Sequence, residues 1–209
     1  MAKNSPYPPS VATLIDEFAK LPGIGKRSAE RLAFHTLSTP RDSAMALALA
    51  IRDARRNLRA CSRCFHIAEG ELCGVCSDGA RDATQFCVVE LPRDVIALEK
   101  ADFYHGVYHV LQGRLSPAEG VGPDNLRVKE LLARAREAEE AGNPVKEIVL
   151  ATRPSAEGDA TAEYLSGLLK EKVPGVRVTR LARGLASGAD LENAAPSSII
   201  FAFQGRRQD

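Results

Sequence analysis

The chain has 209 residues, of which 44% are hydrophobic and 26% are charged. This length and composition are typical of a folded protein with one large core or two modest domains, and they exclude a mainly disordered chain. The N-terminal segment MAKNSPYPPS lacks the apolar stretch of a secretion signal, and the longest helical apolar run, residues 44–51, is far shorter than the roughly 20 residues that span a bilayer. We therefore expect a cytoplasmic protein without membrane contact.

Charge is distributed unevenly along the chain. The formal net charge is +1, but residues 1–63 hold 11 Lys/Arg and 5 Asp/Glu, whereas the remainder holds 17 and 22, which gives +6 followed by −5. A basic N-terminal part favours contact with a polyanion there. Ordinary solvated helix faces are the alternative.

The first elements are predicted to be two helices joined by a glycine turn. Ser10 is expected to cap a first helix whose apolar residues recur at helical spacing and which stops at residues 21–23. The turn Gly23-Ile24-Gly25 then leads into a second amphipathic helix at residues 26–37. The order is helix, hairpin, helix.

This hairpin is suited to binding phosphate. Gly23 and Gly25 allow the backbone to approach a ligand closely, and the next helix presents unpaired N–H groups and the positive end of its dipole. Lys26, Arg27 and Arg31 would flank a bound DNA backbone and add an attraction that depends on salt and not on base sequence. We predict a DNA-binding helix-hairpin-helix, with a plain helix connector as the alternative.

A third helix is expected to begin at Thr39-Pro40, with the threonine as cap and the proline in the first turn. Its far end carries arginines at spacings of three, four and seven residues, which places them on one helix face: Arg52, Arg55, Arg56 and Arg59. Arg55 and Arg59 are our candidates for further DNA contacts. A solvated face would explain the same pattern.

Four cysteines form two C-x2-C pairs separated by eight residues: Cys61, Cys64, Cys73 and Cys76. Two facing pairs supply the four thiolates of a tetrahedral zinc site, with no position left open for water, so one structural zinc ion is predicted. Two disulfides are the alternative, which a chain without a secretion signal disfavours. The fifth cysteine, Cys87, lies in an apolar run and is interpreted as a small buried hydrophobic residue.

From Phe86 onward, strand and helix patterns alternate. Short apolar runs predict strands at residues 86–91, 107–111, 146–151 and 176–181. Helices are expected between them at residues 94–101, 126–141 and 159–171. Such alternation is typical of a parallel sheet covered by helices. The connection at residues 112–125, rich in Gly and Pro, is expected to be an ordered loop.

With these motifs in this order, the chain resembles the RecR recombination-mediator family over essentially its whole length. The family's helix-hairpin-helix matches residues 21–34, its zinc finger matches residues 61–76, and its Toprim domain opens with a strand ending in glutamate, as at Val88-Val89-Glu90. The resemblance implies a multidomain α/β fold. Its expected parts are a helix-hairpin-helix region at 1–59, a four-cysteine zinc finger at 60–80, a Toprim domain with a mainly parallel sheet at 81–182 and a C-terminal segment at 183–209.

The resemblance also implies a function. It suggests a mediator of recombinational DNA repair that binds single- and double-stranded DNA without sequence preference. It further suggests that the protein acts with RecO, and in some settings RecF, to help load a recombinase on single-stranded DNA. A ring-like homotetramer is expected, with the C-terminal segment as an oligomer contact.

The C-terminal segment gives two conflicting expectations. The run Ile199-Ile200-Phe201-Ala202-Phe203 has the local pattern of a strand. The family comparison instead favours a helix that ends at Gly205.

Whether the Toprim domain is catalytic depends on its carboxylates. A catalytic Toprim site holds magnesium with a glutamate from the first strand and an Asp-x-Asp pair after a later strand, because hard cations prefer oxygen ligands. Glu90 matches the glutamate, but Arg153 and Ser155 stand where the aspartates would be. Glu157 and Asp159 remain, and with Glu90 they could bind magnesium weakly or contact a partner protein; equally, they could cap the following helix.

We therefore expect a DNA-binding scaffold and not an enzyme. Two alternatives remain from other functional classes. One is a metal-dependent Toprim nuclease or topoisomerase, and the other is a zinc-stabilised regulatory adaptor without DNA contact.

Overall fold

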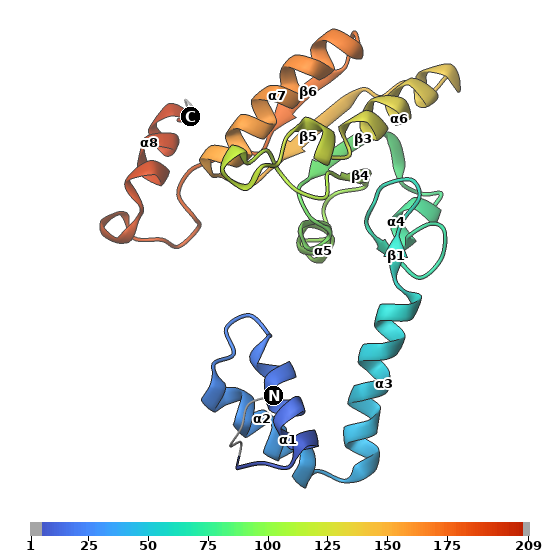
Figure 1. Ribbon diagram of the computed structural model, residues 1–209. Coiled ribbons are helices and arrows are strands. Elements are labelled where there is room, and N and C mark those ends of the chain that lie inside the picture. Colours follow the sequence, from blue (N-terminus) through green and yellow to red (C-terminus); the bar gives the residue numbers. More distant parts are fainter. Residues whose placement is uncertain (1–5, 207–209) are drawn as a thin grey trace. The chain divides into compact units, whose positions relative to one another are not determined.

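The computed structural model describes residues 6–206, and the chain divides into two compact units, Met1–Leu58 and Arg59–Asp209 (Figure 1). The described part of the first unit contains only helices. The second contains a small cysteine-rich finger, a parallel sheet with its helices, and a C-terminal helix. None of the helices in residues 6–206 has the length and apolarity needed to cross a membrane.

The first unit consists of three helices: α1 (Pro9–Ala19), α2 (Lys26–Ser38) and α3 (Arg41–Asn57). The predicted helices are confirmed, but two predicted caps are wrong. Ser10 lies inside α1, because Pro9, with its fixed φ and missing N–H, occupies the first helical position. Thr39 ends α2 and donates its hydroxyl to the carbonyl of Thr36 at 2.8 Å, so that Pro40 is the residue before α3.

The core of the first unit is small. Helices α1 and α2 pack together, and Ala29 and Ala33 are fully buried. Leu32 and Leu37, which the sequence places on the same side of α2, remain 37% and 55% exposed. The unit therefore keeps much of its apolar surface in contact with solvent.

The third helix is shorter than predicted. It ends at Asn57, and Leu58 is already extended, with φ −80° and ψ 135°. Arg59 consequently lies in strand β1 (Arg59–Ala60), which pairs antiparallel with β2 (Ile67–Ala68) in the second unit. The prediction that Arg59 shares a helix face with Arg55 is wrong, because the backbone turns from helix to strand between them.

The second unit is built on a four-stranded parallel sheet. The strands are β3 (Asp82–Val89), β4 (Gly106–Val110), β5 (Glu147–Ala151) and β6 (Arg177–Arg180). Their order is β4-β3-β5-β6, so β3 and β5 are central and all carboxyl ends meet at one edge. The predicted parallel sheet is confirmed.

Helices cover both faces of this sheet (Figure 1). They are α5 (Pro92–Lys100), α6 (Val128–Glu140) and α7 (Ala156–Lys172). Along β3 the side chains alternate, so Phe86 and Val88 pack in the cluster with α6 and α7, whereas Cys87 and Val89 pack in the cluster with α5. Cys87 is 3% exposed, as predicted, and burial raises its pKa to about 12.

Two further segments connect to this domain. The loop after β4 is ordered by two short 3-10 turns, Pro117–Glu119 and Pro123–Asn125. The C-terminal run forms helix α8 (Pro196–Gln204), with Gly205 after its last residue. The local strand pattern is therefore wrong and the family expectation of a helix is confirmed; Pro196 at the first helical position favours this start.

Candidate DNA interface and metal centre

The glycine hairpin of the first unit is open to a ligand. Gly23 has a φ of +78°, and the amide of Ile24 donates to the carbonyl of Leu21 at 3.0 Å, which closes the turn. Gly25 is the N-cap of α2, and a Cβ atom on either glycine would meet no other atom within 4 Å. The unpaired N–H groups at the start of α2 are therefore accessible to an anion.

Three cations surround this helix terminus. Lys26, Arg27 and Arg31 are exposed, and none of them pairs with a carboxylate in residues 6–206. The first turn of α2 also contains no acidic residue. Their charges and the positive end of the helix dipole act in the same direction, which favours a phosphate backbone.

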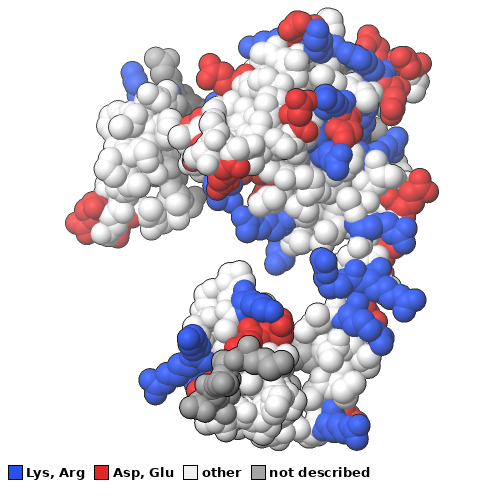
Figure 2. All heavy atoms as spheres, in the orientation of Figure 1, with Lys and Arg blue, Asp and Glu red and all other residues white. Residues whose placement is uncertain are grey.

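A second group of arginines lies on α3. Figure 2 shows basic side chains gathered over the C-terminal part of this helix. The Nε–H of Arg52 donates a hydrogen bond to Asp53 at 2.8 Å, whereas Arg55 and Arg56 are exposed and have no carboxylate partner in the described chain. Arg55 remains a candidate for DNA contact on this helix, and Arg56 joins it. Arg59, also exposed, belongs to the second unit.

The four cysteines of the two C-x2-C pairs converge on one point. Their sulfur atoms all lie within 4.8 Å of one another, and those of Cys64 and Cys73 are 3.5 Å apart. Tetrahedral zinc with bonds of about 2.3 Å requires sulfur separations of about 3.8 Å, so the cluster has the size of a zinc site. None of the five cysteines forms a disulfide in this structure. The cluster Cys61, Cys64, Cys73 and Cys76 is a structural zinc site.

Hydrogen bonds from nearby backbone amides hold the zinc ligands in position. The amide of Cys61 donates to the carbonyl of His66 at 2.7 Å, and the amide of Cys73 donates to the sulfur of Cys61 at 3.3 Å. Hydrogen bonds from the thiols of Cys64 and Cys76 lower the pKa of Cys73. The hydrogen bond with Cys73 in turn raises the pKa of Cys64, so these bonds favour a thiolate at Cys73 and a protonated thiol at Cys64. Binding of zinc to all four sulfur atoms would therefore release protons.

The zinc finger is attached to the edge of the parallel sheet. The carbonyl of Cys64 accepts the amide of Val110 at 2.8 Å, and the carbonyl of Phe65 accepts the side-chain amide of Gln112 at 2.6 Å. The Phe65 ring meets His109 edge-on, with 5.5 Å between ring centroids. The finger thus covers the free edge of β4, which would otherwise expose unpaired backbone groups.

Glu90, at the end of β3, has a structural role in this chain. It is 2% exposed, and its Oε1 accepts the backbone amide of Arg153 at 2.8 Å. Its Oε2 lies 3.9 Å from a guanidinium nitrogen of Arg114. A Cβ atom at Gly158 would lie 3.1 Å from Oε1 and only 2.0 Å from the Arg153 carbonyl oxygen. The carboxylate therefore joins the loop after β5 to the sheet.

The other two candidate carboxylates are also engaged. Asp159 accepts hydrogen bonds from Arg180 and Arg183, and the Arg183 bond is the largest cause of the lowering of its pKa to about 2. Glu157 accepts the hydroxyl of Ser155 at 3.0 Å, and its own backbone amide and this hydroxyl lower its pKa. Ser155, and neither carboxylate, caps α7 by accepting the amide of Gly158 at 3.2 Å.

Within residues 6–206 the cysteine cluster is the one group of candidate ligands that converges closely enough to hold a metal ion. Glu90, Glu157 and Asp159 are not brought together in that way. The sequence interpretation also missed Arg180 and Arg183, which bind Asp159. Their position at and just after the end of β6 could have predicted this contact, because the carboxyl ends of parallel strands share one edge.

Three protein-family profiles match the chain. The profile of the Toprim domain matches residues 84–182, that of the RecR helix-hairpin-helix matches residues 11–55, and that of the RecR four-cysteine zinc finger domain matches residues 58–78. A helix-hairpin-helix motif, a four-cysteine zinc finger and a Toprim domain in one chain define a protein class of DNA recombination and repair.

Similar curated proteins extend over almost the whole chain. Recombination protein RecR of Chloroflexus aurantiacus is 51% identical over 199 residues, 95% of this chain and 94% of its own length. The proteins of the same name from Rhodopirellula baltica and Heliobacterium modesticaldum are 50% and 48% identical, over 95% and 97% of this chain and 96% and 98% of their own lengths. The chain belongs to the RecR family of recombination proteins.

Proposed function

We propose that this chain is a noncatalytic, DNA-binding mediator of recombinational repair. The observation that carries the proposal is the open hairpin at Gly23 and Gly25. Beside it, Lys26, Arg27 and Arg31 have no carboxylate partner in the described chain. Phosphate contacts of this kind bind single- and double-stranded DNA without reading base sequence. Arg55 and Arg59 add exposed positive charge for the same ligand.

The proposal includes protein partners. By analogy with the family, the chain acts in the cytoplasm with RecO, and in some settings RecF, to help load a recombinase on single-stranded DNA. Glu157 is the candidate carboxylate least committed to internal contacts, and we propose it as an acidic contact for a partner. Magnesium binding by Glu90, Glu157 and Asp159 would be weak, since Glu90 and Asp159 are held by the backbone of Arg153 and by two arginines.

The proposal also includes a homo-oligomer, with a tetramer expected. Its support is the apolar surface that the two units leave exposed, including Met45 at 50% and Ile51 at 59% on α3 and Phe203 at 66% on α8. Exposed apolar surface of this extent is typical of association sites.

The decisive test is DNA binding by fluorescence anisotropy over a salt series. Replacing Lys26, Arg27 and Arg31 by alanine should weaken binding strongly and lower the slope of log affinity against log salt by up to about three, because each phosphate contact contributes about 0.9. The matched control replaces three exposed cations of the second unit, Lys100, Arg136 and Lys170. If the control loses affinity and the hairpin variant does not, the DNA site lies elsewhere.

Two further measurements address the rest of the proposal. With magnesium present the DNA should stay intact, and nicking would favour the nuclease alternative. In a loading assay with RecO and single-stranded DNA coated by its binding protein, the hairpin variant should fail to accelerate recombinase assembly. If that variant accelerates recombinase assembly as much as the native chain does, recombinase loading does not depend on the hairpin.

A further inference from the structure

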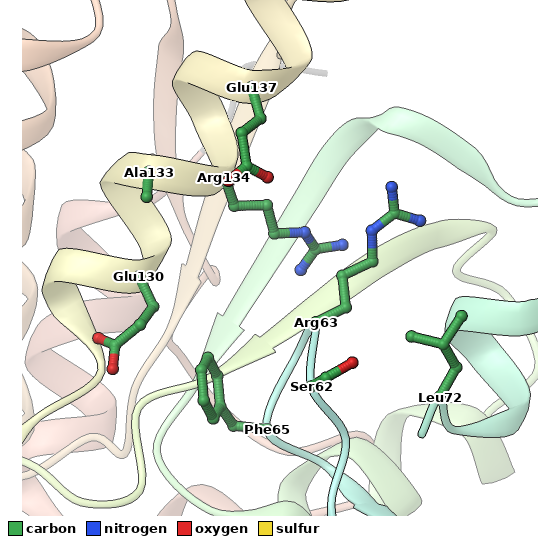
Figure 3. Close-up of a pocket in the computed structure, with 8 residues that line it drawn as sticks. All are labelled: Ser62, Arg63, Phe65, Leu72, Glu130, Ala133, Arg134 and Glu137. Atoms are coloured by element: carbon green, nitrogen blue, oxygen red, sulfur yellow. The ribbon is translucent and has the colours of Figure 1, made fainter. Parts of the chain in front are cut away.

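A pocket lies between the zinc finger and helix α6 in the second unit (Figure 3). Its volume of about 400 Å³ falls within the range of small-ligand sites. It is lined from the finger by Ser62, Arg63, Phe65 and Leu72 and from α6 by Glu130, Ala133, Arg134 and Glu137. The glycine hairpin and the candidate carboxylates contribute nothing to it.

Arg134 is the central cation of this pocket. Its exposed fraction is 8%, and its position is fixed by one hydrogen bond to the carbonyl of Tyr108 at 2.5 Å and by packing over the Phe86 ring at 4.4 Å. No carboxylate lies within 4.0 Å of its guanidinium in residues 6–206. The negative charges that act on this guanidinium come from the cysteines of the zinc cluster, Cys76, Cys64 and Cys61. Its donors other than the one that reaches Tyr108 face no protein acceptor in the described chain, so they can bind an oxyanion in the pocket.

Arg63 brings a second guanidinium to the same space. Figure 3 shows both groups entering the pocket, Arg134 from α6 and Arg63 from the finger. Arg63 is exposed and likewise has no carboxylate partner among the described residues. Two like charges in one pocket repel each other, and an oxyanion between them would relieve the repulsion and accept hydrogen bonds from both.

The remaining lining restricts the ligand further. Phe65, Leu72 and Ala133 offer apolar surface beside the two arginines. Glu130, which pairs with Arg127 at 2.7 Å, and Glu137 add negative charge at the same pocket. Those carboxylates would repel a polyanion such as a nucleic-acid backbone, whereas a single carboxylate next to an apolar group fits the lining.

We propose that this pocket binds the C-terminal carboxylate of a peptide whose last side chain is apolar. The carboxylate would accept hydrogen bonds from Arg134 and Arg63, and the side chain would pack on Phe65, Leu72 and Ala133. The proposed ligand is thus a protein tail, and the pocket shares no residue with the hairpin.

The test is an NMR titration of the zinc-loaded full chain, observing the side-chain Nε–H signals of arginine. The probes are N-acetyl-leucine, N-acetyl-leucinamide, inorganic phosphate and a short thymidine oligonucleotide. N-acetyl-leucine should shift the Arg134 and Arg63 signals saturably at millimolar concentration, whereas the amide should shift them little. Arg63→Gln, at an exposed position, should weaken binding about five- to tenfold, because it removes a charge-assisted contact.

Arg136→Gln is the matched control, since Arg136 is exposed on the same helix but does not line the pocket. Its affinity for N-acetyl-leucine should equal that of the native chain. Equal binding of acid and amide would overturn the role of the carboxylate, and stronger binding of phosphate or the oligonucleotide would overturn the ligand class. If no probe shifts Arg134, the proposal is also overturned, and Arg134 merely balances the charge of the zinc thiolates.

Discussion

Gly25 shows how one missing side chain can leave room for a ligand. It is the N-cap of α2 with φ −79° and ψ 166°, which an alanine can adopt, and a Cβ there would meet no atom of the protein within 4 Å. The packing of the chain therefore does not require a glycine here, whereas the close backbone approach of the proposed DNA ligand does.

Gly25→Ala should accordingly leave the melting temperature almost unchanged while lowering DNA affinity. The added methyl would separate the backbone N–H groups from a phosphate, at a cost of about 1 kcal/mol, roughly fivefold in affinity. Gly79→Ala, at another glycine with open space around it, is the control and should bind DNA like the native chain. Unchanged affinity in Gly25→Ala would argue against close backbone contact.

His109 is a second residue whose environment has a measurable consequence. It is fully buried on β4, its Nε2 lies 2.7 Å from the carbonyl of Arg127, and its Nδ1 has no partner among the described residues. Burial lowers its pKa from 6.5 to about 4. The folded protein therefore holds a neutral imidazole in a pH range where the unfolded chain binds a proton.

We predict that His109 makes the protein less stable as the pH falls from about 6.5 to about 4. Protons favour the unfolded chain in this window, and the loss approaches about 3 kcal/mol at its acid end. In urea unfolding at several pH values, the free energy of unfolding should depend less on pH in His109→Asn than in the native chain. Asparagine keeps a side-chain donor. His35→Asn, on the exposed surface of α2, is the control for histidine loss in general. Parallel pH profiles of the native chain and His109→Asn would contradict the prediction.

At the scale of elements, the zinc finger acts as an edge cover for the sheet. Among the described strands β4 pairs only with β3, and the carbonyl of Cys64 accepts the amide of Val110 at 2.8 Å. Phe65 and Val75 of the finger pack against the cluster on the α5 face of the sheet. The finger is too small to have its own core, so its fold depends on zinc. The backbone groups at the edge of β4 in turn depend on the finger for their hydrogen-bond partners.

Removal of zinc should therefore loosen β4 before the central strands. Hydrogen exchange after chelation should speed up at the Val110 amide by at least about tenfold, which corresponds to about 1.4 kcal/mol, whereas the amides of β5 should change less. Chelator already saturated with zinc is the control. Uniform acceleration over all strands would mean that the finger and the sheet unfold as one unit.

Elements also differ in how far their sequence predicts them. The four strands and the helices between them followed from alternating patterns, because each buries a face of definite period. The caps at Ser10 and Thr39 did not, since a neighbouring proline sets the start of α1 and α3 in each case. The run at residues 199–203 gave the pattern of a strand, yet it forms α8.

At the scale of the whole molecule, the exposed apolar surface argues for association. On α8, Ile200 and Phe203 are 55% and 66% exposed, whereas Phe201 packs under the guanidinium of Arg183 at 5.1 Å. Arg183 in turn binds Asp159 at the start of α7. The inner side of α8 is thus held to its own domain, and the outer side remains open for a second chain.

Phe203→Glu should lower the molar mass measured by light scattering after size exclusion. Burying a phenylalanine contributes about 2 kcal/mol, so its loss should weaken association at least about thirtyfold. Gln204→Glu adds the same charge at the adjacent exposed position and should leave the mass unchanged. An unaltered mass for Phe203→Glu would exclude this side of α8 from the contact.

The sequence by itself determined the zinc ligands, the hairpin with its cations, and the parallel sheet. Each of these depends on neighbouring residues: a C-x2-C spacing, two glycines before a basic helix, and the period of an apolar pattern. Such local signals remain visible without knowledge of the rest of the chain.

Only the tertiary structure decided which side chains from distant segments meet. Glu90 binds the backbone of Arg153, Asp159 binds Arg180 and Arg183, and the pocket of Arg63 and Arg134 joins the finger to α6. These contacts decide whether a carboxylate is available to bind magnesium or already bound by another group of the protein. No periodicity in the sequence records them.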